Sequence, residues 1–400
     1  MILPREAMKN GLTAPGRRRL GVVLAALILA ACSASPEPRE VERLLAESWQ
    51  GYVRRFLTPE GRVVVPERQG GTISEAQAYA LLRAVWAGDA GTFARVARWT
   101  ETHLSREKCL GDHLLAWHWG PRGDGTAGVL DPNTAADADL DFALALVLAH
   151  RRGWRPAQEP DYLALARRVA ADIWRREVVR LPDGTPVLAP GNWHEAAPPY
   201  LINSSYFFPA AYRLLAEATG DSRWRELAEA TYPLAARLGQ GLGDLPGVGL
   251  FPDWALLKAD GQVLPAPGRE SHFGWEAVRL PWRLALDRLW FGRPEPVQVL
   301  ASRFLPFLKA RWQAEGRLAA VYAYDGRPLV SYESPVIYAG VLAAALAAGD
   351  REWADALARR LMSFYRRDEQ GGYFEAPDNY YANNWAWLGL ALYAGWVKPF

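Results

Sequence analysis

Three positions in this chain combine a carboxylate with surroundings that suit acid–base chemistry. Glu75 opens a predicted helix, Asp137 is followed by Asp139 and Asp141 just before an apolar run, and Glu276 lies in a Trp-rich stretch. Two carboxyl groups on either side of a scissile bond are the usual means of hydrolysing a glycosidic linkage, with one acting as general acid. These residues therefore make glycoside hydrolysis the leading chemistry.

The same acids also have purely structural interpretations. Ser74 and Gln77 match the S-x-x-Q pattern of a capping box, in which Glu75 would only complement the helix dipole. Thr134 can cap the next helix of this kind in the same way. Glu276 stands three residues before an arginine, which is the spacing of a helical salt bridge. Local pattern alone leaves both interpretations open.

Two observations favour a functional role for some of these acids. Three aspartates within five residues, at 137–141, repel one another unless ligands, cations or hydrogen-bond donors offset the cost. Trp275, Trp282 and Trp290 lie near Glu276 in sequence, and desolvation by such rings gives a carboxylate a working pKa. Glu333 is a further candidate, which nothing nearby distinguishes.

The chain lacks the residue patterns of other common chemistries. It has no G-x-S-x-G, no P-loop and no closely spaced cysteine pair. His113 and His118 are five residues apart and so do not share a helix face as metal ligands would, and we expect neither metal nor cofactor. The 18 Trp, 16 Tyr and 13 Phe either fill a large core or stack on sugar rings. Stacking is favoured for tryptophans that lie beside carboxylates in predicted loops.

The N-terminus has the pattern of an export signal. Arginines at 17–19 precede an apolar run at 20–31, which is short for a membrane span. Its end, Leu29-Ala30-Ala31-Cys32, resembles a bacterial lipoprotein processing site, which would remove residues 1–31 and lipidate Cys32 as a membrane anchor. The alternative is an ordinary signal peptide cut after Ala31, giving a secreted or periplasmic protein. Residues 32–40 would then form a tether.

Composition indicates one folded domain after that tether. No long Pro/Ser/Gly linker divides residues 41–400, and half of the residues are hydrophobic, so we expect a single domain. A monomer is also expected. Without residues 1–31 the chain has 41 basic and 43 acidic residues, a net charge of about −2. This balance argues against a nucleic-acid partner. Cys109 would be alone, without a disulfide partner.

A two-helix unit recurs six times, and it predicts the architecture that positions these acids. The first helices are amphipathic and therefore belong outside, at 41–56, 92–104, 162–174, 223–238, 297–312 and 353–365. The second helices are apolar nearly all round and therefore belong inside, at 78–86, 140–149, 207–215, 278–289, 336–348 and 385–393. This pattern predicts an all-α protein, an alpha/alpha toroid of six inner and six outer helices. Turn-rich intervals at 58–72, 120–133, 180–200 and 240–272 leave room for short strands only.

Each inner helix opens on a cluster of polar and aromatic residues. Because every second helix of an up-and-down array points the same way, all six clusters should meet at one end of the molecule. A functional site is expected there. The clusters are at 74–79, 133–139, 203–206, 273–279, 331–335 and 380–385.

The chain resembles glycoside hydrolase family 8, a family of bacterial endoglucanases, some xylanases and chitosanases. The motifs are, in order, Ser74-Glu75-x-Gln77-x-Tyr79, Leu115-Ala116-Trp117-x-Trp119, Asp131-x-Asn133-x-Ala135-x-Asp137-Ala138-Asp139-x-Asp141, Asn203-x-Ser205-Tyr206-Phe207, Pro252-Asp253-Trp254, Arg279-x-Pro281-Trp282-Arg283 and Tyr380-Tyr381 with Trp387-x-Gly389-Leu390. The resemblance implies the toroid fold and hydrolysis with inversion. It implies substrate binding by Tyr79, Trp117, Trp119, Asp139, Tyr206, Trp254, Arg279, Trp282 and Tyr381.

The resemblance also implies individual catalytic roles. Glu75 matches the general acid, and Asp137 matches a residue that binds and distorts the sugar at the cleavage point, described by some as the second catalytic residue. Tyr206 would help to hold the attacking water. Glu276 stands at the position of the general base, where the family usually has aspartate. Its extra methylene shifts the carboxylate by about 1 Å, and such a misplacement can cost on the order of 100-fold in rate.

We therefore expect an exported, endo-acting glycosidase for a β-1,4-linked glucan such as cellulose. Xylan, chitosan or an exopolysaccharide are the alternative substrates. A second hypothesis is a polysaccharide-binding lipoprotein with little hydrolytic activity, motivated by Glu276 in place of aspartate. A lyase on the same fold is a third.

Overall fold

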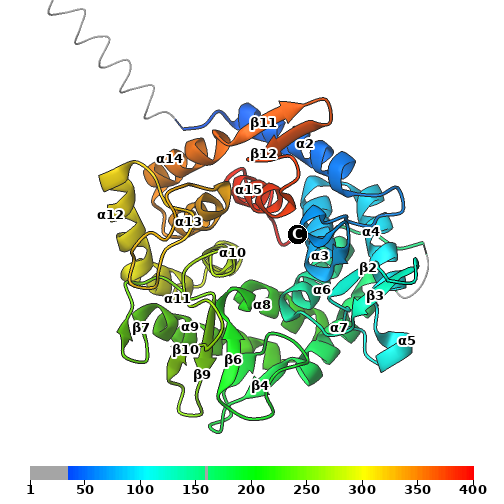
Figure 1. Cartoon of the computed structure of the whole chain (residues 1–400), viewed down its shortest axis with the longest axis horizontal. Coiled ribbons are helices and arrows are strands. Elements are labelled where there is room, and N and C mark those ends of the chain that lie inside the picture. The colour runs from blue at the N-terminus through cyan, green and yellow to red at the C-terminus, as the bar shows by residue number, and fades with distance from the viewer. Residues whose placement is uncertain (1–34, 158–160) are drawn as a thin grey trace, which may run out of the picture.

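The computed structural model describes residues 35–157 and 161–400, and it forms a double ring of helices (Figure 1). The predicted signal segment and Cys32 lie outside the described residues. The inner ring consists of α3 (Ser74–Ala87), α6 (Ala136–Arg151), α8 (Pro209–Thr219), α10 (Arg279–Phe291), α13 (Pro335–Ala347) and α15 (Tyr380–Tyr393). The outer ring consists of α2 (Pro38–Phe56), α4 (Ala90–His103), α7 (Tyr162–Arg176), α9 (Arg223–Gln240), α11 (Glu295–Val299) with α12 (Leu305–Glu315), and α14 (Arg351–Met362). The predicted toroid is confirmed.

Burial distinguishes the two rings as the sequence predicted. Nearly every residue of α13 and α6 is buried, because neighbours cover these helices on all sides. Outer helices such as α2 and α7 bury one face and leave their charges in solvent. The boundaries differ by a few residues. Helix α2 begins at Pro38, so the end of the predicted tether is already helical.

The ring closes where the last inner helix packs against the first. Arg83 of α3 is buried and donates to Oδ1 of Asn384 of α15 at 3.2 Å. Its guanidinium also lies over the rings of Tyr52 and Trp387. On the same two inner helices, the rings of Tyr79 and Trp385 meet edge to face at 5.7 Å. Segments about 300 residues apart in sequence therefore form one continuous core.

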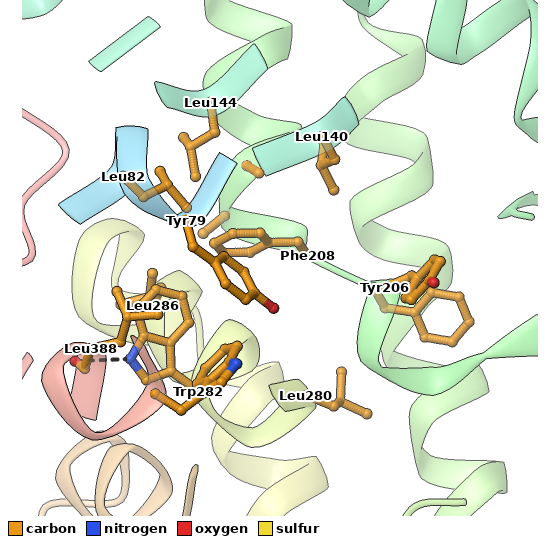
Figure 2. Packing of buried hydrophobic residues seen from close by; sticks show 14 of the residues in the cluster. Tyr79, Leu82, Leu140, Leu144, Tyr206, Phe208, Leu280, Trp282, Leu286 and Leu388 are labelled. Carbon is orange, nitrogen blue, oxygen red and sulfur yellow. Dashed lines mark hydrogen bonds between the residues drawn. The ribbon is translucent and has the colours of Figure 1, made fainter. Parts of the chain in front are cut away.

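A cluster of large side chains fills the middle of this core (Figure 2). Trp282 of α10 is 1% exposed and packs against Trp86, Phe208 and Trp385. Its indole Nε1 donates to the carbonyl oxygen of Leu388 at 3.4 Å. Burial of this kind of ring contributes strongly to stability, because both area and ring contacts are lost when it is removed.

The strands are short and lie in the connections between helices, as predicted. The two largest sheets among the described residues have three strands each, β1–β2–β3 and β10–β9–β6, all antiparallel. The strand bounds are β1 (Thr72–Ile73), β2 (His118–Pro121), β3 (Ala127–Asp131), β4 (Val178–Arg180), β5 (Pro186–Leu188), β6 (Tyr200–Asn203), β7 (Gly241–Leu242), β8 (Leu245–Pro246), β9 (Trp254–Leu257), β10 (Val263–Pro265), β11 (Tyr365–Asp368) and β12 (Gly371–Phe374). The β11–β12 hairpin was not predicted. The helix predicted at 353–365 includes Tyr365, the first residue of β11, whereas α14 ends at Met362.

Two smaller helical features also differ from the sequence-based interpretation. The fifth outer helix changes to a wide turn at Leu300–Phe304 between α11 and α12, close to Pro306, whose nitrogen has no hydrogen to donate. A four-residue helix, α5 (Glu107–Leu110), carries the exposed Cys109, which is free. None of the helices in the described segments has the length and apolar character needed to cross a membrane.

Both predicted capping interactions are wrong. Helix α3 begins at Ser74 itself, and the Ser74 hydroxyl has no hydrogen-bond partner among the described residues. The Gln77 side chain instead accepts from the backbone N–H of Val63 and donates to Thr100 at 2.8 Å. Thr134 donates to Oε1 of Glu177 rather than capping α6. Distant partners have taken the polar groups that a local capping box would use.

Candidate active site

A cavity of about 890 Å³ lies at the end of the toroid where the inner helices begin. Each inner helix contributes a residue from its first turn or from the segment that leads into it: Glu75, Asp137, Tyr206, Glu276, Val336 and Tyr380. The expectation that the six openings meet at one end is thus confirmed. Glu333, from the fifth opening, is absent from this lining and pairs with Arg360 and Tyr338.

One buried arginine joins the three carboxylates that the sequence singled out. Nη1 of Arg279 donates to Oε2 of Glu75 and to Oδ2 of Asp137, each at 2.7 Å. Nη2 donates to Oε2 of Glu276, so the predicted ion pair forms, although Glu276 lies in the turn before α10 and not within the helix. Arg279 is 1% exposed and also contacts the Tyr79 hydroxyl at 3.1 Å. Its positive charge offsets the repulsion among the three acids.

The surroundings of Glu75 favour its protonated form up to neutral pH. Burial raises the pKa of the Glu75 carboxyl to about 7; Arg279 opposes this shift, and the charges of Asp137 and Glu276 add to it. The hydroxyl of Tyr380 donates to Oε1 of Glu75 and favours the ionised form. A carboxylic acid with this pKa holds a proton that it can give to a leaving group near neutral pH.

Glu276 is held on one side and open on the other. Its Oε2 contacts Arg279 and accepts from Nδ2 of Asn203 at 3.2 Å. No described residue hydrogen-bonds to Oε1, and Glu276 lines the cavity. Burial raises the pKa of the Glu276 carboxyl, and Arg279 opposes that shift. Such an oxygen can accept a proton from water in the cavity.

The geometry keeps the acid and the candidate base within reach of one bond. Glu75 and Glu276 contact neighbouring nitrogens of the same guanidinium. The distance between their nearest oxygens therefore cannot exceed the length of two hydrogen bonds plus the width of the guanidinium. This distance is below the upper limit of about 9.5 Å for an inverting pair. A much larger distance between Glu75 and Glu276, with no open groove between them, would have contradicted their assignment as acid and base.

The three aspartates at the start of α6 have three separate partners. Asp137 turns to Arg279 and the cavity, whereas Asp141 pairs with Arg283 at 2.7 Å inside the core. Asp139 accepts the backbone N–H of Leu115 at 2.7 Å. The cations and donors that the crowding of acids required are therefore present, and only Asp137 of the three faces the cavity.

The predicted substrate-binding residues divide into two groups. Trp117, Tyr206, Trp254 and Tyr381 line the cavity, which is where rings that stack on sugars would lie.

The other five do not line the cavity. Trp282 is in the core, Tyr79 and Arg279 lie beneath the carboxylates, and Asp139 holds the segment before Trp117. Trp119 packs against Trp99. These residues would act by holding the residues that line the cavity. Trp290, whose closeness in sequence suggested a role near Glu276, lies at the other end of α10 and donates to Val397.

Several cavity residues were missed by sequence reasoning. Tyr380 lines the cavity and Asn203 does not, yet each holds one of the two candidate catalytic carboxylates. Both belong to the noted helix openings and to the motifs of the resemblance, but neither was singled out as a site residue. Trp193, Arg68 and Arg269 also line the cavity, from loops without a recognisable motif. The described residues contain no group of His, Cys, Asp and Glu arranged to hold a metal ion.

Comparison with known proteins agrees with this fold. The sequence profile described as glycosyl hydrolases family 8 matches residues 20–393. Endoglucanase A of Acetivibrio thermocellus is 28% identical over 344 residues, which cover 84% of this chain and 67% of that protein. An endoglucanase of Pseudomonas fluorescens strain SBW25 is 34% identical over 281 residues, covering 68% of this chain and 66% of that one.

A solved structure shows the same fold. The β-1,3-1,4-glucanase from Paenibacillus sp. X4 superposes with a TM-score of 0.75 at 20% identity, covering 91% of this chain and 95% of that one. The double helical ring and its carboxylate-lined cavity define a glycoside hydrolase of the toroid class. This chain belongs to glycosyl hydrolases family 8. The aligned regions span about half to two thirds of the length of the curated relatives.

Proposed function

We propose that this protein is an exported, endo-acting hydrolase that cleaves a β-1,4-linked glucan with inversion at the anomeric carbon. The observation that carries the proposal is the contact of Glu75, Asp137 and Glu276 with one buried guanidinium in an open, aromatic-lined cavity. An acid with a pKa of about 7 and a carboxylate with a free oxygen can protonate a leaving group and activate water.

In this mechanism Glu75 donates its proton to the glycosidic oxygen as the bond to the anomeric carbon breaks. Glu276 takes a proton through Oε1 from a water that attacks the opposite face of the sugar. Asp137, fixed by Arg279, would bind the sugar at the cleavage point and favour its distortion. Tyr206 lines the same cavity with the Arg279 guanidinium 5.5 Å from its ring, and would help to hold the water.

The contacts of Glu276 support its use in place of the usual aspartate. Arg279 and Asn203 both hold Oε2, which removes much of the freedom that a longer side chain would otherwise have. The backbone of the same segment is tied down as well, since Oδ1 of Asp253 accepts the N–H groups of Gly274 and Ala277 at 3.1 and 2.7 Å. A base whose carboxylate and backbone segment are both fixed can satisfy the geometry that catalysis requires.

The relatives suggest which polymer to test first. Those cited above are named endoglucanases and a β-1,3-1,4-glucanase, so cellulose or a mixed-linkage glucan is the proposed substrate, with xylan and chitosan as alternatives. Reducing-sugar release from soluble forms of all four would rank them. Binding without release of sugar would favour the alternative of a polysaccharide-binding protein, and unsaturated products would indicate a lyase.

The decisive test is Glu75→Gln, which keeps the shape of the side chain and removes its proton. Hydrolysis should be abolished while the helical circular dichroism spectrum is unchanged. NMR of the first-formed product should show inverted anomeric configuration in the unaltered protein. Substantial hydrolysis by the Gln variant, or retention of configuration, would refute the assignment.

The cellular location is part of the proposal. The basic and apolar N-terminal pattern and Cys32 support export and a lipid anchor. Mass spectrometry of the mature N-terminus in a bacterial host would detect a lipid on Cys32. Cleavage after Ala31 without a lipid would indicate a secreted or periplasmic protein instead.

A further inference from the structure

Two arginines at the cavity stand apart from the carboxylate cluster. The guanidinium of Arg68 lies 5.4 Å from the centre of the Trp117 ring, and that of Arg269 lies 4.8 Å from the Trp254 ring. All four residues line the cavity. Each of these two tryptophans therefore has an arginine over one of its faces, in an arrangement that a cation–π interaction stabilises.

The two pairs flank the candidate catalytic residues on different sides. The carbonyl of Trp117 accepts the backbone N–H of Ser74, the neighbour of Glu75, so the first pair lies on the side of the acid. Trp254 of β9 is paired with Asn203 of β6, whose side chain donates to Glu276, so the second pair lies on the side of the base. A polymer bound across the cleavage point would pass both arginines.

Apart from its contact with the tryptophan ring, neither guanidinium has a partner in the described part of the protein. Within residues 35–157 and 161–400, no side-chain hydrogen bond or ion pair involves the guanidinium of Arg68 or Arg269, and both residues are exposed. Arg279, by contrast, has all of its contacts with protein groups. Arginine stays charged at every relevant pH and presents a planar set of donors that suits a carboxylate or another oxyanion.

The surrounding charges make the two sides unequal. Glu67 and Asp131 also line the cavity on the side of Arg68 and reduce its attraction for an anion. On the other side, the neighbouring Glu270 is paired with His272 at 3.2 Å. Arg269 is therefore the more available cation.

From this arrangement we propose that the cavity recognises a glucan bearing anionic substituents, such as carboxyl groups, with Arg269 and, more weakly, Arg68 as the residues that bind them. This inference rests on the proposed function for its polymer. The stacked tryptophan holds each guanidinium at the cavity, so a charged group on a bound polymer could meet the arginine without breaking a hydrogen bond or ion pair of the protein.

Carboxymethylcellulose and hydroxyethylcellulose test the proposal, because they share a backbone and differ in the charge of the substituent. For Arg269→Gln, kcat/KM should fall about fivefold more on the carboxymethyl polymer than on the hydroxyethyl polymer, the effect of losing a partly exposed ion pair. Arg68→Gln should show a smaller difference of the same sign. The preference of the unaltered protein should also weaken at about 0.5 M salt, because salt screens exposed charges.

Arg225→Gln is the matched control, since Arg225 is an exposed arginine on outer helix α9, away from the cavity lining. It should change neither rate. Equal losses on both polymers in Arg269→Gln would mean that the arginine only supports Trp254, and no loss on either would also overturn the proposal.

Affinity electrophoresis in gels containing each polymer separates this inference from the proposed function. In a Glu75→Gln background, which needs no hydrolysis, Arg269→Gln should weaken retardation by the carboxymethyl polymer more than by the hydroxyethyl polymer. If the unaltered protein hydrolyses neither polymer but this difference is found, the proposed function fails and anion recognition stands. If hydrolysis occurs and no difference is found, the reverse holds.

Discussion

Replacing Tyr380 by phenylalanine removes one hydroxyl that donates to Oε1 of Glu75 and keeps the ring that lines the cavity. A hydrogen bond donated to a carboxylate stabilises its ionised form, so losing it raises the pKa of Glu75 above about 7. Such bonds contribute about 1.5–3 kcal/mol to a charged acceptor and about 1 kcal/mol to a neutral one. The difference corresponds to a rise of about one pH unit.

The assay is the pH dependence of kcat/KM on a soluble glucan. If Glu75 must be protonated to act, the rate of the unaltered protein falls above pH 7, and in Tyr380→Phe this alkaline limb moves to about pH 8. Relative to the rate at pH 6, the variant should be about fivefold more active at pH 8 than the unaltered protein.

Tyr381→Phe is the matched control, because it removes the neighbouring hydroxyl, which donates to the carbonyl of Trp275 rather than to Glu75. Its rate should change without a comparable shift of the limb. An alkaline limb that stays near pH 7 in Tyr380→Phe, or moves to lower pH, would refute the reasoning that Glu75 is the acid and that Tyr380 sets its pKa.

Three further outcomes are expected. Because the pKa of Glu75 is raised from 4.5 to about 7, its ionisation lowers the free energy of unfolding increasingly between these pH values and by a constant amount above them. Glu75→Gln should therefore raise the free energy of unfolding in urea by up to about 3 kcal/mol at pH 8 and not at pH 4. Equal gains at both pH values would contradict this. Trp282→Ala should lose about 3–5 kcal/mol in the same measurement, because the ring is fully buried. Glu276→Asp should lower kcat on the order of 100-fold if Arg279 and Asn203 fit the longer base; an increase would mean that they do not.

The architecture could be predicted because it depends on pattern over many residues. Helices that are apolar all round, such as α13, can only be inside, and the amphipathic helices must cover them. Individual ends were less predictable. At Ser74 and Thr134 the sequence offers a sound local cap, yet the side chains of Gln77 and Thr134 bond to partners up to 58 residues away, which no local pattern reveals.

The candidate site could be predicted in part for the same reason. Motifs marked Glu75 and Asp137, and the spacing from Glu276 marked Arg279. That both carboxylates bind the Arg279 guanidinium could not be predicted, because these contacts join residues 204 and 142 positions apart. Trp282 shows the converse error. Its position in a motif suggested that it binds sugar, whereas no residue of α10 lines the cavity. The lining residues of this segment, Trp275 and Glu276, come before the helix.

The link between Glu75 and Tyr380 has a consequence for biosynthesis. It joins the first inner helix to the last, 305 residues later, beside the contact that closes the ring. A growing or truncated chain that lacks α15 therefore has neither a closed core nor a correctly tuned acid, and contacts this distant in sequence form late. The protein should therefore acquire hydrolytic activity only late in folding, once α15 has closed the ring.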